Sequence, residues 1–341
     1  MSTESLSQAK VVLGIDIGGT ATNATVLGED GEFLVDRMVE VPSRVTEGPA
    51  AALEAVAAAM DLVLETTGIS RDRVMAIGLD TPGPASATGV ISSAGATNFS
   101  DEEWWGYDIR SGVERYCGIP VIYNNDGNAA ALYAHRTLFR EHQYHRSSVS
   151  AIVGTGLGGG VIEHGEVVRG AAGMAGELGH ILITMPGLLV EGQPVPQCNC
   201  GLHGDVESIA SLTGIRKNLL PFWLTQYPDH PLHDLPIDKA AKAVRGYGVD
   251  GDEMALRIFD QQAQALGELF TIASNFTDPD AYFVGGGVIE AAPHFRDWFL
   301  DRVRAHTTLR AESAAVAQFA LVTDLDMAGA RGAALAALHA S

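Results

Sequence analysis

Apolar and polar positions follow one plan in two separate stretches of the chain. From Val11 to Leu34, an apolar run leads into the turn Gly18-Gly19-Thr20, which is followed by an alternating run, a second turn and a third short run. From Val149 to Val168, the same order recurs around the glycine cluster 154–160. Each stretch predicts a meander of three strands. The repetition indicates an internally duplicated structure.

Helical and strand patterns follow each meander. The predicted helices lie at Ala50–Thr67, from about Asn128, from about Glu207, at Glu253–Phe276 and at Ala328–Ala340, and the predicted strands at Val74–Leu79, Pro120–Asn124 and Ala281–Val284. Strands that alternate with helices predict an α/β fold, and two copies of one unit predict two lobes with a cleft between them. We place a small lobe at residues 1–126, completed by the C-terminal helix 328–341, and a large lobe at residues 127–327.

Composition narrows the functional class. A chain of 341 residues with 46% apolar and 19% charged residues is typical of a globular protein of two domains, and no apolar run approaches the ~20 residues of a membrane span. The balance of 22 basic against 42 acidic residues gives a net charge of -20, which disfavours nucleic acids and anionic membranes as partners. Met1–Gln8 lacks the pattern of a signal peptide, so we expect a cytoplasmic protein with reduced cysteines or a metal site.

The glycine clusters predict anion binding, because successive glycines let backbone N–H groups approach a phosphate closely. None of the four lysines follows a glycine, which excludes a P-loop. Gly154, Gly156 and Gly159 have the spacing of a dinucleotide-binding turn, but the β-branched run after them excludes the helix that such a turn requires. Gly285, Gly286 and Gly287 end an apolar strand and predict either a surface for a nucleotide or a plain strand-to-helix turn.

Asp126 follows the apolar strand Val121-Ile122-Tyr123 and precedes a helical alanine run. Ligands bind at the carboxyl ends of strands in α/β folds, and a carboxylate there can accept a hydroxyl proton during phosphoryl transfer. Asp is also a favoured helix N-cap, so a capping role for Asp126 remains open. Asn128 can serve as the cap instead, which would leave Asp126 for catalysis.

These pieces, in this order, resemble the ROK family (repressor, open reading frame, kinase) of the actin-like sugar kinase superfamily over nearly the whole chain. The matching pieces are Asp16 to Thr20, Asp80-Thr81-Pro82-Gly83-Pro84, Asn125 to Asn128, Gly154 to Gly160, Glu177 to His180, Cys198 to Gly201 with Gly204 and Glu207, and Gly285 to Gly287. The resemblance implies two ribonuclease-H-like (actin-like ATPase) lobes. It implies an ATP- and Mg²⁺-dependent kinase for the 6-hydroxyl of a hexose, and a homodimer or homotetramer.

The resemblance also assigns roles to residues of this chain. Asp126 looks like the catalytic base. The residues similar to the family's phosphate- and nucleotide-binding positions are Asp16, Gly18, Gly19, Thr20, Gly154, Thr155, Gly156, Gly158, Gly285, Gly286 and Gly287. The residues similar to its sugar-binding positions are Gly83, Asn98, Asn125, Glu177, His180 and Glu207. Glucose is the first expected sugar, with N-acetylmannosamine, other amino sugars and fructose as alternatives, and ATP or polyphosphate is the donor.

The family's structural zinc site, held by one His and three Cys, is altered in this chain. His180, Cys198 and Cys200 match it, but Asp205 stands where the third thiolate belongs. Asp can ligate zinc, so a site of His, two Cys and Asp is predicted, with loss of the metal as the alternative. The family also contains sugar-sensing repressors. A repressor needs a helix-turn-helix module, and here the first strand begins near Lys10, which favours the kinase.

Overall fold

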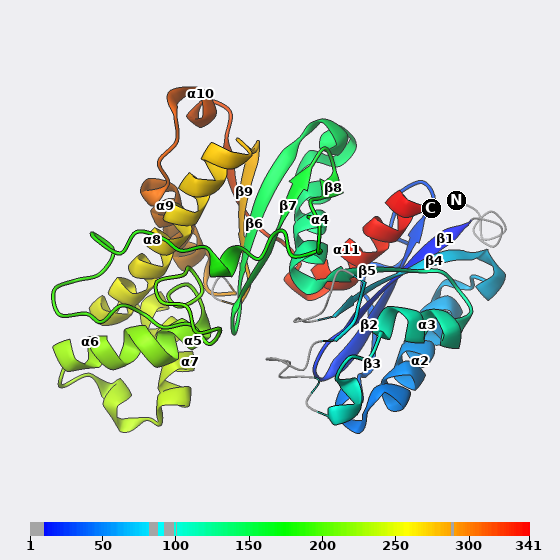
Figure 1. Cartoon of the computed structure of the whole chain (residues 1–341), viewed down its shortest axis with the longest axis horizontal. Coiled ribbons are helices and arrows are strands. Elements are labelled where there is room, and N and C mark those ends of the chain that lie inside the picture. The colour runs from blue at the N-terminus through cyan, green and yellow to red at the C-terminus, as the bar shows by residue number, and fades with distance from the viewer. Residues whose placement is uncertain (1–9, 82–87, 92–98, 100, 288–289) are drawn as a thin grey trace. The chain divides into compact units, whose positions relative to one another are not determined.

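Short strands separated by glycine and polar turns form two sheets. The computed structural model describes residues 10–81, 88–91, 99, 101–287 and 290–341. Within these residues the strands are β1 (Val11–Ile17), β2 (Ala21–Gly28), β3 (Val39–Pro42), β4 (Val74–Thr81), β5 (Val121–Asn125), β6 (Ser147–Val153), β7 (Leu157–Glu163), β8 (Glu166–Val167), β9 (Ala281–Gly285) and β10 (Gln318–Leu321). Figure 1 shows them as arrows. The fold is therefore α/β, as the alternating pattern predicts.

Helices connect and cover the strands. They are α2 (Pro49–Thr67), α3 (Ile109–Cys117), α4 (Asp126–Phe139), α5 (Leu212–Gly214), α6 (Leu220–Gln226), α7 (Ile237–Val249), α8 (Glu253–Phe276), α9 (Pro293–His306), α10 (Ala311–Ala314) and α11 (Leu325–Ala340). Helix α2 begins with Pro49 and ends at Gly68 in the left-handed conformation, and the Asp252 side chain caps α8. Among the described residues, none of these helices combines the length and the apolar character that crossing a membrane requires.

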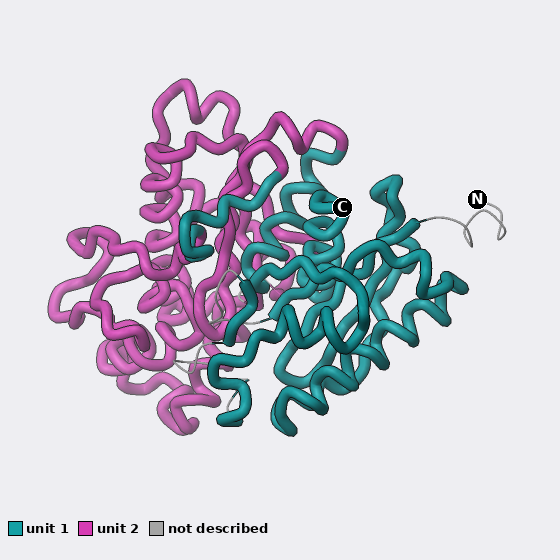
Figure 2. Tube along the Cα trace, turned by 45° about the vertical axis from the view of Figure 1, so that its right-hand side comes forward, with its two compact units in different colours: residues 1–140, 166–175, 324–341 teal, residues 141–165, 176–323 magenta. Residues whose placement is uncertain are grey.

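The chain divides into two compact units, coloured separately in Figure 2. The first unit comprises residues 1–140, 166–175 and 324–341, and the second comprises residues 141–165 and 176–323. The C-terminal helix α11 groups with the first unit. Residues 127–140, which the sequence placed in the large lobe, also group with the first unit, because α4 continues directly from β5 and packs against α11.

The first unit is built on a sheet of order β3-β2-β1-β4-β5. Strand β1 pairs antiparallel with β2 and parallel with β4, and β4 pairs parallel with β5. Helices α4 and α11 lie on one face and α2 and α3 on the other (Figure 1). Glycines in the sheet allow the close approach of α11, since a methyl group added at Gly14 or Gly78 would lie 1.8 Å from the carbonyl oxygen of Ala330 or Ala333.

The second unit is built on a sheet of order β10-β9-β6-β7-β8. Strand β6 pairs antiparallel with β7 and parallel with β9, and β9 pairs parallel with β10. Strands β6 to β10 therefore occupy, in chain order, the sheet positions that β1 to β5 occupy in the first unit. The internal duplication predicted from the repeated meander is confirmed.

Two predicted elements differ from the structure. The third strand of the first meander was expected near Leu34, but Phe33 forms only an isolated bridge to Leu27, and the edge strand β3 lies further along the chain. The helix expected from about Glu207 begins at Leu212, capped by the side chain of Ser211. The backbone before it pairs with another segment instead, because Glu207 N–H donates to the Gly179 carbonyl (2.8 Å).

Candidate functional site

Three carboxylates gather in the first unit, and we call them the carboxylate cluster: Asp16 in β1, Asp80 in β4 and Asp126 at the start of α4. Asp16 and Asp80 are paired positions of the two parallel strands. Asp80 is fully buried, Asp16 is partly buried and Asp126 is exposed. The strands thus place two of the carboxylates side by side near the end of the sheet where β1 and β4 finish. The helix that follows β5 supplies the third.

The ionisation of the cluster reflects its burial. Burial raises the pKa of Asp16 to about 6, a hydrogen bond from Asn23 Nδ2 (3.2 Å) opposes that rise, and the neighbouring charge of Asp126 adds to it. Burial, followed by the charges of Asp16 and Asp126, raises the pKa of Asp80 well above its ordinary value. Such shifts are typical of sites that bind cations or transfer protons.

Asn125, not Asn128, caps helix α4. The Asn125 side chain accepts a hydrogen bond from the Asn128 backbone N–H (2.8 Å). The prediction that Asn128 is the cap is therefore wrong. The accompanying expectation, that a residue other than Asp126 serves as the N-cap, is confirmed. Asp126 is the first helical residue, and its Oδ1 accepts a hydrogen bond from the Gly127 N–H (2.8 Å).

The first glycine cluster forms the turn between β1 and β2. The Gly18 N–H donates to the Ala21 carbonyl (2.8 Å), which closes the turn that begins two residues after Asp16. Gly19 and Thr20 lie at its tip, where Thr20 is exposed. The turn therefore joins the phosphate-binding residues predicted in this unit directly to the carboxylate cluster.

The other two glycine clusters meet in the second unit. Gly154, Thr155, Gly156 and Gly158 form the turn between β6 and β7, which the Gly154 N–H closes by donating to the Gly156 carbonyl (2.9 Å). Gly285 pairs with Ile152 across β9 and β6. Gly286 has φ +99°, and a methyl group there would lie 2.1 Å from the Val153 carbonyl oxygen. Gly287 accepts a hydrogen bond from Arg245.

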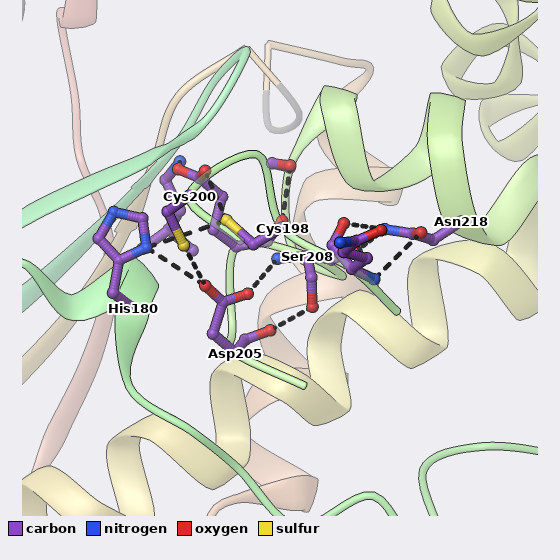
Figure 3. Close-up of polar contacts among 10 residues, drawn as sticks. His180, Cys198, Cys200, Asp205, Ser208 and Asn218 are labelled. Carbon is purple, nitrogen blue, oxygen red and sulfur yellow. Dashed lines mark hydrogen bonds and ion pairs between the residues drawn. The ribbon is translucent and has the colours of Figure 1, made fainter. Parts of the chain in front are cut away.

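Four predicted metal ligands converge in the second unit (Figure 3). His180 Nδ1 lies 3.2 Å from Asp205 Oδ2 and 3.9 Å from Cys198 Sγ, and Cys200 Sγ lies 3.6 Å from Asp205 Oδ2. One ligand atom from each residue falls within 4.8 Å of every other. Zinc at ~2.0–2.3 Å from its ligands holds them roughly 3.3–3.8 Å apart in a tetrahedron, so this donor set fits zinc.

Asp205 is oriented by its surroundings. It is fully buried, and its Oδ1 accepts a hydrogen bond from the Ser208 N–H (3.0 Å), while Oδ2 faces His180 and Cys200. Figure 3 shows the carboxylate between these partners. A carboxylate held in this way presents one oxygen to a metal, which is the arrangement the predicted site requires.

The predicted sugar-binding residues lie in different places. Glu177 is exposed and immediately precedes a 3₁₀ turn, Leu178–His180, that carries His180. Glu207 Oε2 accepts a hydrogen bond from the Leu157 N–H (2.8 Å), and its Oε1 lies 3.4 Å from Cys198 Sγ. Glu207 thereby joins the glycine turn to the metal-ligand cluster. Asn125 lies in the first unit, and Gly83 and Asn98 lie outside the described residues.

Sequence reasoning did not single out Asp80 as a site residue. It follows the apolar strand of β4 just as Asp126 follows that of β5, so the same rule about strand ends could have found it. Its burial has no signal in the local sequence, since it depends on the cover supplied by α11 at the other end of the chain.

Comparison with known proteins places the chain in a family. The model of the ROK family matches residues 12–340. A glucokinase of Halalkalibacterium halodurans is 32% identical over 85% of this chain and 87% of its own length. A ROK hexokinase of Thermus thermophilus aligns over 97% of this chain and 98% of its own, with a TM-score of 0.75 and 30% identity. A ROK family glucokinase of Streptomyces griseus, solved with glucose and AMPPNP, aligns over 96% and 99% with a TM-score of 0.68 and 26% identity. The chain belongs to the ROK family.

Proposed function

We propose that this ROK-family sugar kinase transfers the γ-phosphoryl group of ATP to the 6-hydroxyl of a hexose, with glucose as the first substrate. The observation that carries the proposal is the position of Asp126, which begins α4 directly after β5, at the end of the sheet where Asp16 of β1 and Asp80 of β4 also lie. The Asp126 carboxylate accepts the proton of the hydroxyl, the sugar oxygen attacks the γ-phosphorus, and the bond to the β-phosphate breaks to release ADP.

Magnesium fits the oxygen donors of the first unit. Asp16 and Asp80 offer carboxylate oxygens, the ligands that Mg²⁺ prefers, and no other residue that the structure describes forms a hydrogen bond with the Asp80 carboxylate. When bound, the ion neutralises charge on the phosphates during transfer. Asn23 keeps the Asp16 carboxylate oriented through the bond from its Nδ2.

Backbone amides are proposed to hold the nucleotide, because the chain lacks a P-loop lysine. Gly18, Gly19 and Thr20 do so in the first unit, and Gly154, Thr155, Gly156 and Gly158 in the second, with Gly285, Gly286 and Gly287 beside the latter turn. The AMPPNP bound to the Streptomyces griseus glucokinase favours ATP over polyphosphate as the donor.

The sugar hydroxyls are assigned to Asn125, Glu177, His180 and Glu207, with Gly83 and Asn98 as further predicted contacts. Carboxylate oxygens accept from hydroxyl groups and a ring nitrogen can donate to them. Nδ1 of His180 faces Asp205 and Cys198, which leaves Nε2 as the nitrogen for the sugar. The relatives and the glucose of the Streptomyces griseus structure favour glucose, and N-acetylmannosamine, other amino sugars and fructose are the alternatives.

A structural zinc is proposed at His180, Cys198, Cys200 and Asp205. The metal would fix the His180 ring and so act on sugar affinity without touching the reacting atoms. We also assign both units to the ribonuclease-H-like fold on their common strand order. Assembly as a homodimer or homotetramer and a cytoplasmic location remain predictions, and light scattering of the purified protein tests the first.

The proposed function is tested by a coupled assay of ADP release with ATP, Mg²⁺ and a panel of glucose, N-acetylmannosamine, glucosamine and fructose. We expect kcat/KM to be highest for glucose, and the product to be the 6-phosphate by NMR. A kcat/KM tenfold higher for N-acetylmannosamine than for glucose would change the proposed substrate but not the proposed reaction. Absence of ADP release with every hexose would contradict the proposal.

A further inference from the structure

The turn between β6 and β7 is held from outside by one segment of the second unit. The Leu212 N–H donates to the Gly154 carbonyl (3.0 Å), and the Thr213 N–H donates to the Thr155 carbonyl (3.1 Å). The Thr213 hydroxyl donates to the same Thr155 carbonyl (2.8 Å). Two successive carbonyls of the turn are therefore bound by two successive residues, and Thr213 supplies two of the three hydrogen bonds.

These hydrogen bonds fix the direction of the N–H group that follows each carbonyl. A trans peptide unit is planar, so its N–H points away from its own C=O. Because the Gly154 carbonyl faces Leu212, the Thr155 N–H points away from Leu212. Because the Thr155 carbonyl faces Thr213, the Gly156 N–H points away from Thr213. The turn therefore presents two adjacent N–H groups on the side opposite the segment that holds it.

These two N–H groups are left for a ligand. The Gly154 N–H closes the turn by donating to the Gly156 carbonyl (2.9 Å), so the bonds from outside are not needed to close it. The Leu157 N–H donates to Glu207 Oε2 (2.8 Å). In the part of the chain that the structure describes, no group accepts from the N–H of Thr155 or Gly156, and Thr155 is exposed. Adjacent N–H groups of fixed direction are a binding surface for an anion.

The segment that holds the turn is itself anchored to the core of the second unit. We call residues 207–213 the support segment. Gln262 of α8 is fully buried, and its Nε2 donates to the carbonyls of Ile209 (2.9 Å) and Ser211 (3.1 Å). The Ser211 hydroxyl donates to the Glu207 carbonyl (2.7 Å). Because a core helix fixes the support segment, the support segment can hold the turn in one conformation.

We propose that Thr213 is a positioning residue whose two hydrogen bonds direct the N–H groups of Thr155 and Gly156 at a phosphate of the nucleotide. The oxygens of one phosphate group can accept from both N–H groups at once. Thr213 itself does not touch the nucleotide and acts only through the direction of the turn. The inference rests on the proposed function and deepens it, because it names the N–H groups that bind phosphate and the side chain that orients them.

Removal of the Thr213 hydroxyl tests the proposal without enlarging the side chain. Thr213→Val keeps the shape and loses one hydrogen bond to the turn, so binding of AMPPNP, measured by calorimetry, should weaken about fivefold. In the coupled assay kcat/KM for ATP should fall by a similar factor, with the KM for glucose unchanged. Thr213→Ser keeps the hydroxyl and should restore both values.

Thr225→Val is the matched control. The Thr225 hydroxyl donates to the Phe222 carbonyl (2.7 Å) within its own helix, α6, which belongs to the same unit. This variant loses the same kind of hydrogen bond as Thr213→Val. It should keep the AMPPNP affinity and the kcat/KM for ATP of the wild type.

Amide resonances supply a second readout, which a purely structural role of Thr213 would not give. In the ¹⁵N-labelled wild type, addition of inorganic triphosphate should shift the amide resonances of Thr155 and Gly156. The same addition should shift them less in Thr213→Val than in Thr225→Val, because the two N–H groups are no longer held in one direction.

The outcomes separate this inference from the proposed function. Absence of AMPPNP binding by the wild type would contradict both. If the wild type phosphorylates glucose but Thr213→Val binds AMPPNP as tightly, or triphosphate leaves the Thr155 and Gly156 resonances unmoved, the inference alone is overturned. Equal losses of affinity for AMPPNP and glucose in Thr213→Val, or no recovery in Thr213→Ser, would also overturn it, since they indicate a general disturbance of the unit.

Discussion

The two units share a strand order but differ in what their corresponding strands carry. In the first unit β1 and β4 bear Asp16 and Asp80 near their ends, whereas the corresponding β6 and β9 end in Val153 and Gly285. The first unit therefore collects carboxyl groups at this end of its sheet. At the same end of its sheet, in the second unit, the ends of β6 and β9 offer only backbone groups for polar contacts. Its titratable ligands lie in the irregular segments 177–180 and 198–207.

This difference indicates that the two units, although they share a strand order, contribute different chemical groups to the function. Carboxylates can hold a cation and accept a proton. Glycine turns bind phosphate through backbone N–H groups, which do not titrate near neutral pH. If the proposed function is correct, substitutions of the site residues in the first unit should lower kcat. Substitutions of the site residues in the second unit should change metal content, stability and KM.

The largest expected effect is on turnover, from Asp126→Asn in the first unit. The amide cannot accept the hydroxyl proton, so kcat should fall at least about 100-fold while glucose affinity by calorimetry stays within about threefold. Stability should change little, because Asn125 caps the helix.

Asp108→Asn is the matched control, since Asp108 caps α3 in the same unit by accepting from the Ser111 N–H. Asn caps helices about as well as Asp, so this variant should keep its kcat. Near-native turnover of Asp126→Asn would remove Asp126 from the role of base. An equal loss in both variants would mean that a general disturbance of the unit, and not the removal of a base, lowers turnover.

The second prediction concerns the metal content of the second unit. We expect about one zinc per chain by elemental analysis, bound by His180, Cys198, Cys200 and Asp205. Cys198→Ser should lose most of it and raise the KM for sugar, because the His180 ring is no longer fixed. Chelator should strip the wild type more readily than Asp205→Cys, which restores a third thiolate.

Asp126→Asn serves as the control for these variants and should keep its zinc, since Asp126 belongs to the other unit. Zinc far below one per chain in wild-type protein made with ample zinc, together with unchanged sugar affinity in Cys198→Ser, would mean that the cysteines are remnants of a lost site.

The sequence predicted the parts of the fold that depend on local pattern. Helix α8 was expected at Glu253–Phe276, where the structure has it, because apolar residues recur with a helical period along the whole segment. The edge strand β3 was placed too early because none of its four residues is fully buried, which leaves a weak pattern. The cap of α4 was assigned to Asn128 because propensity alone does not choose between two neighbouring asparagines.

The candidate site was predictable where a residue type and its place at a strand end suffice. Asp126 meets that condition, whereas Cys198 and Cys200 lie outside the strands and were identified through the resemblance to the ROK family. The contacts of Asp80 and Glu207 do not, since they arise from segments distant in the sequence: α11 covers Asp80, and the Leu157 N–H binds Glu207. Burial and tertiary hydrogen bonds of this kind require the packed structure.

A third prediction compares packing in the two units through one substitution, Gly to Ala. Gly78→Ala places a methyl group 1.8 Å from the Ala333 carbonyl oxygen, so α11 must shift, and we expect a loss of about 1–3 kcal/mol in the free energy of unfolding. Gly246→Ala in α7 meets nothing within 4 Å and should gain up to about 1 kcal/mol. Urea denaturation measures both values. A neutral Gly78→Ala would show that α11 packs less tightly on the sheet.

The smallest expected change in stability comes from Gly154→Ala in the second unit, and it separates the phosphate role of this turn from its fold. Gly154 does not have a positive φ, and the nearest atom to an added methyl group is 3.9 Å away, so the free energy of unfolding should change by less than about 0.5 kcal/mol. The methyl group would still stand where a phosphate approaches the backbone, so the KM for ATP should rise about tenfold with the KM for glucose unchanged. Gly267→Ala in α8, whose methyl group would lie 2.6 Å from the backbone of His306, should instead lower stability and so marks the purely structural response. If Gly154→Ala keeps both its stability and its KM for ATP, the turn does not contact phosphate, and nucleotide recognition would rest on the turn of the first unit.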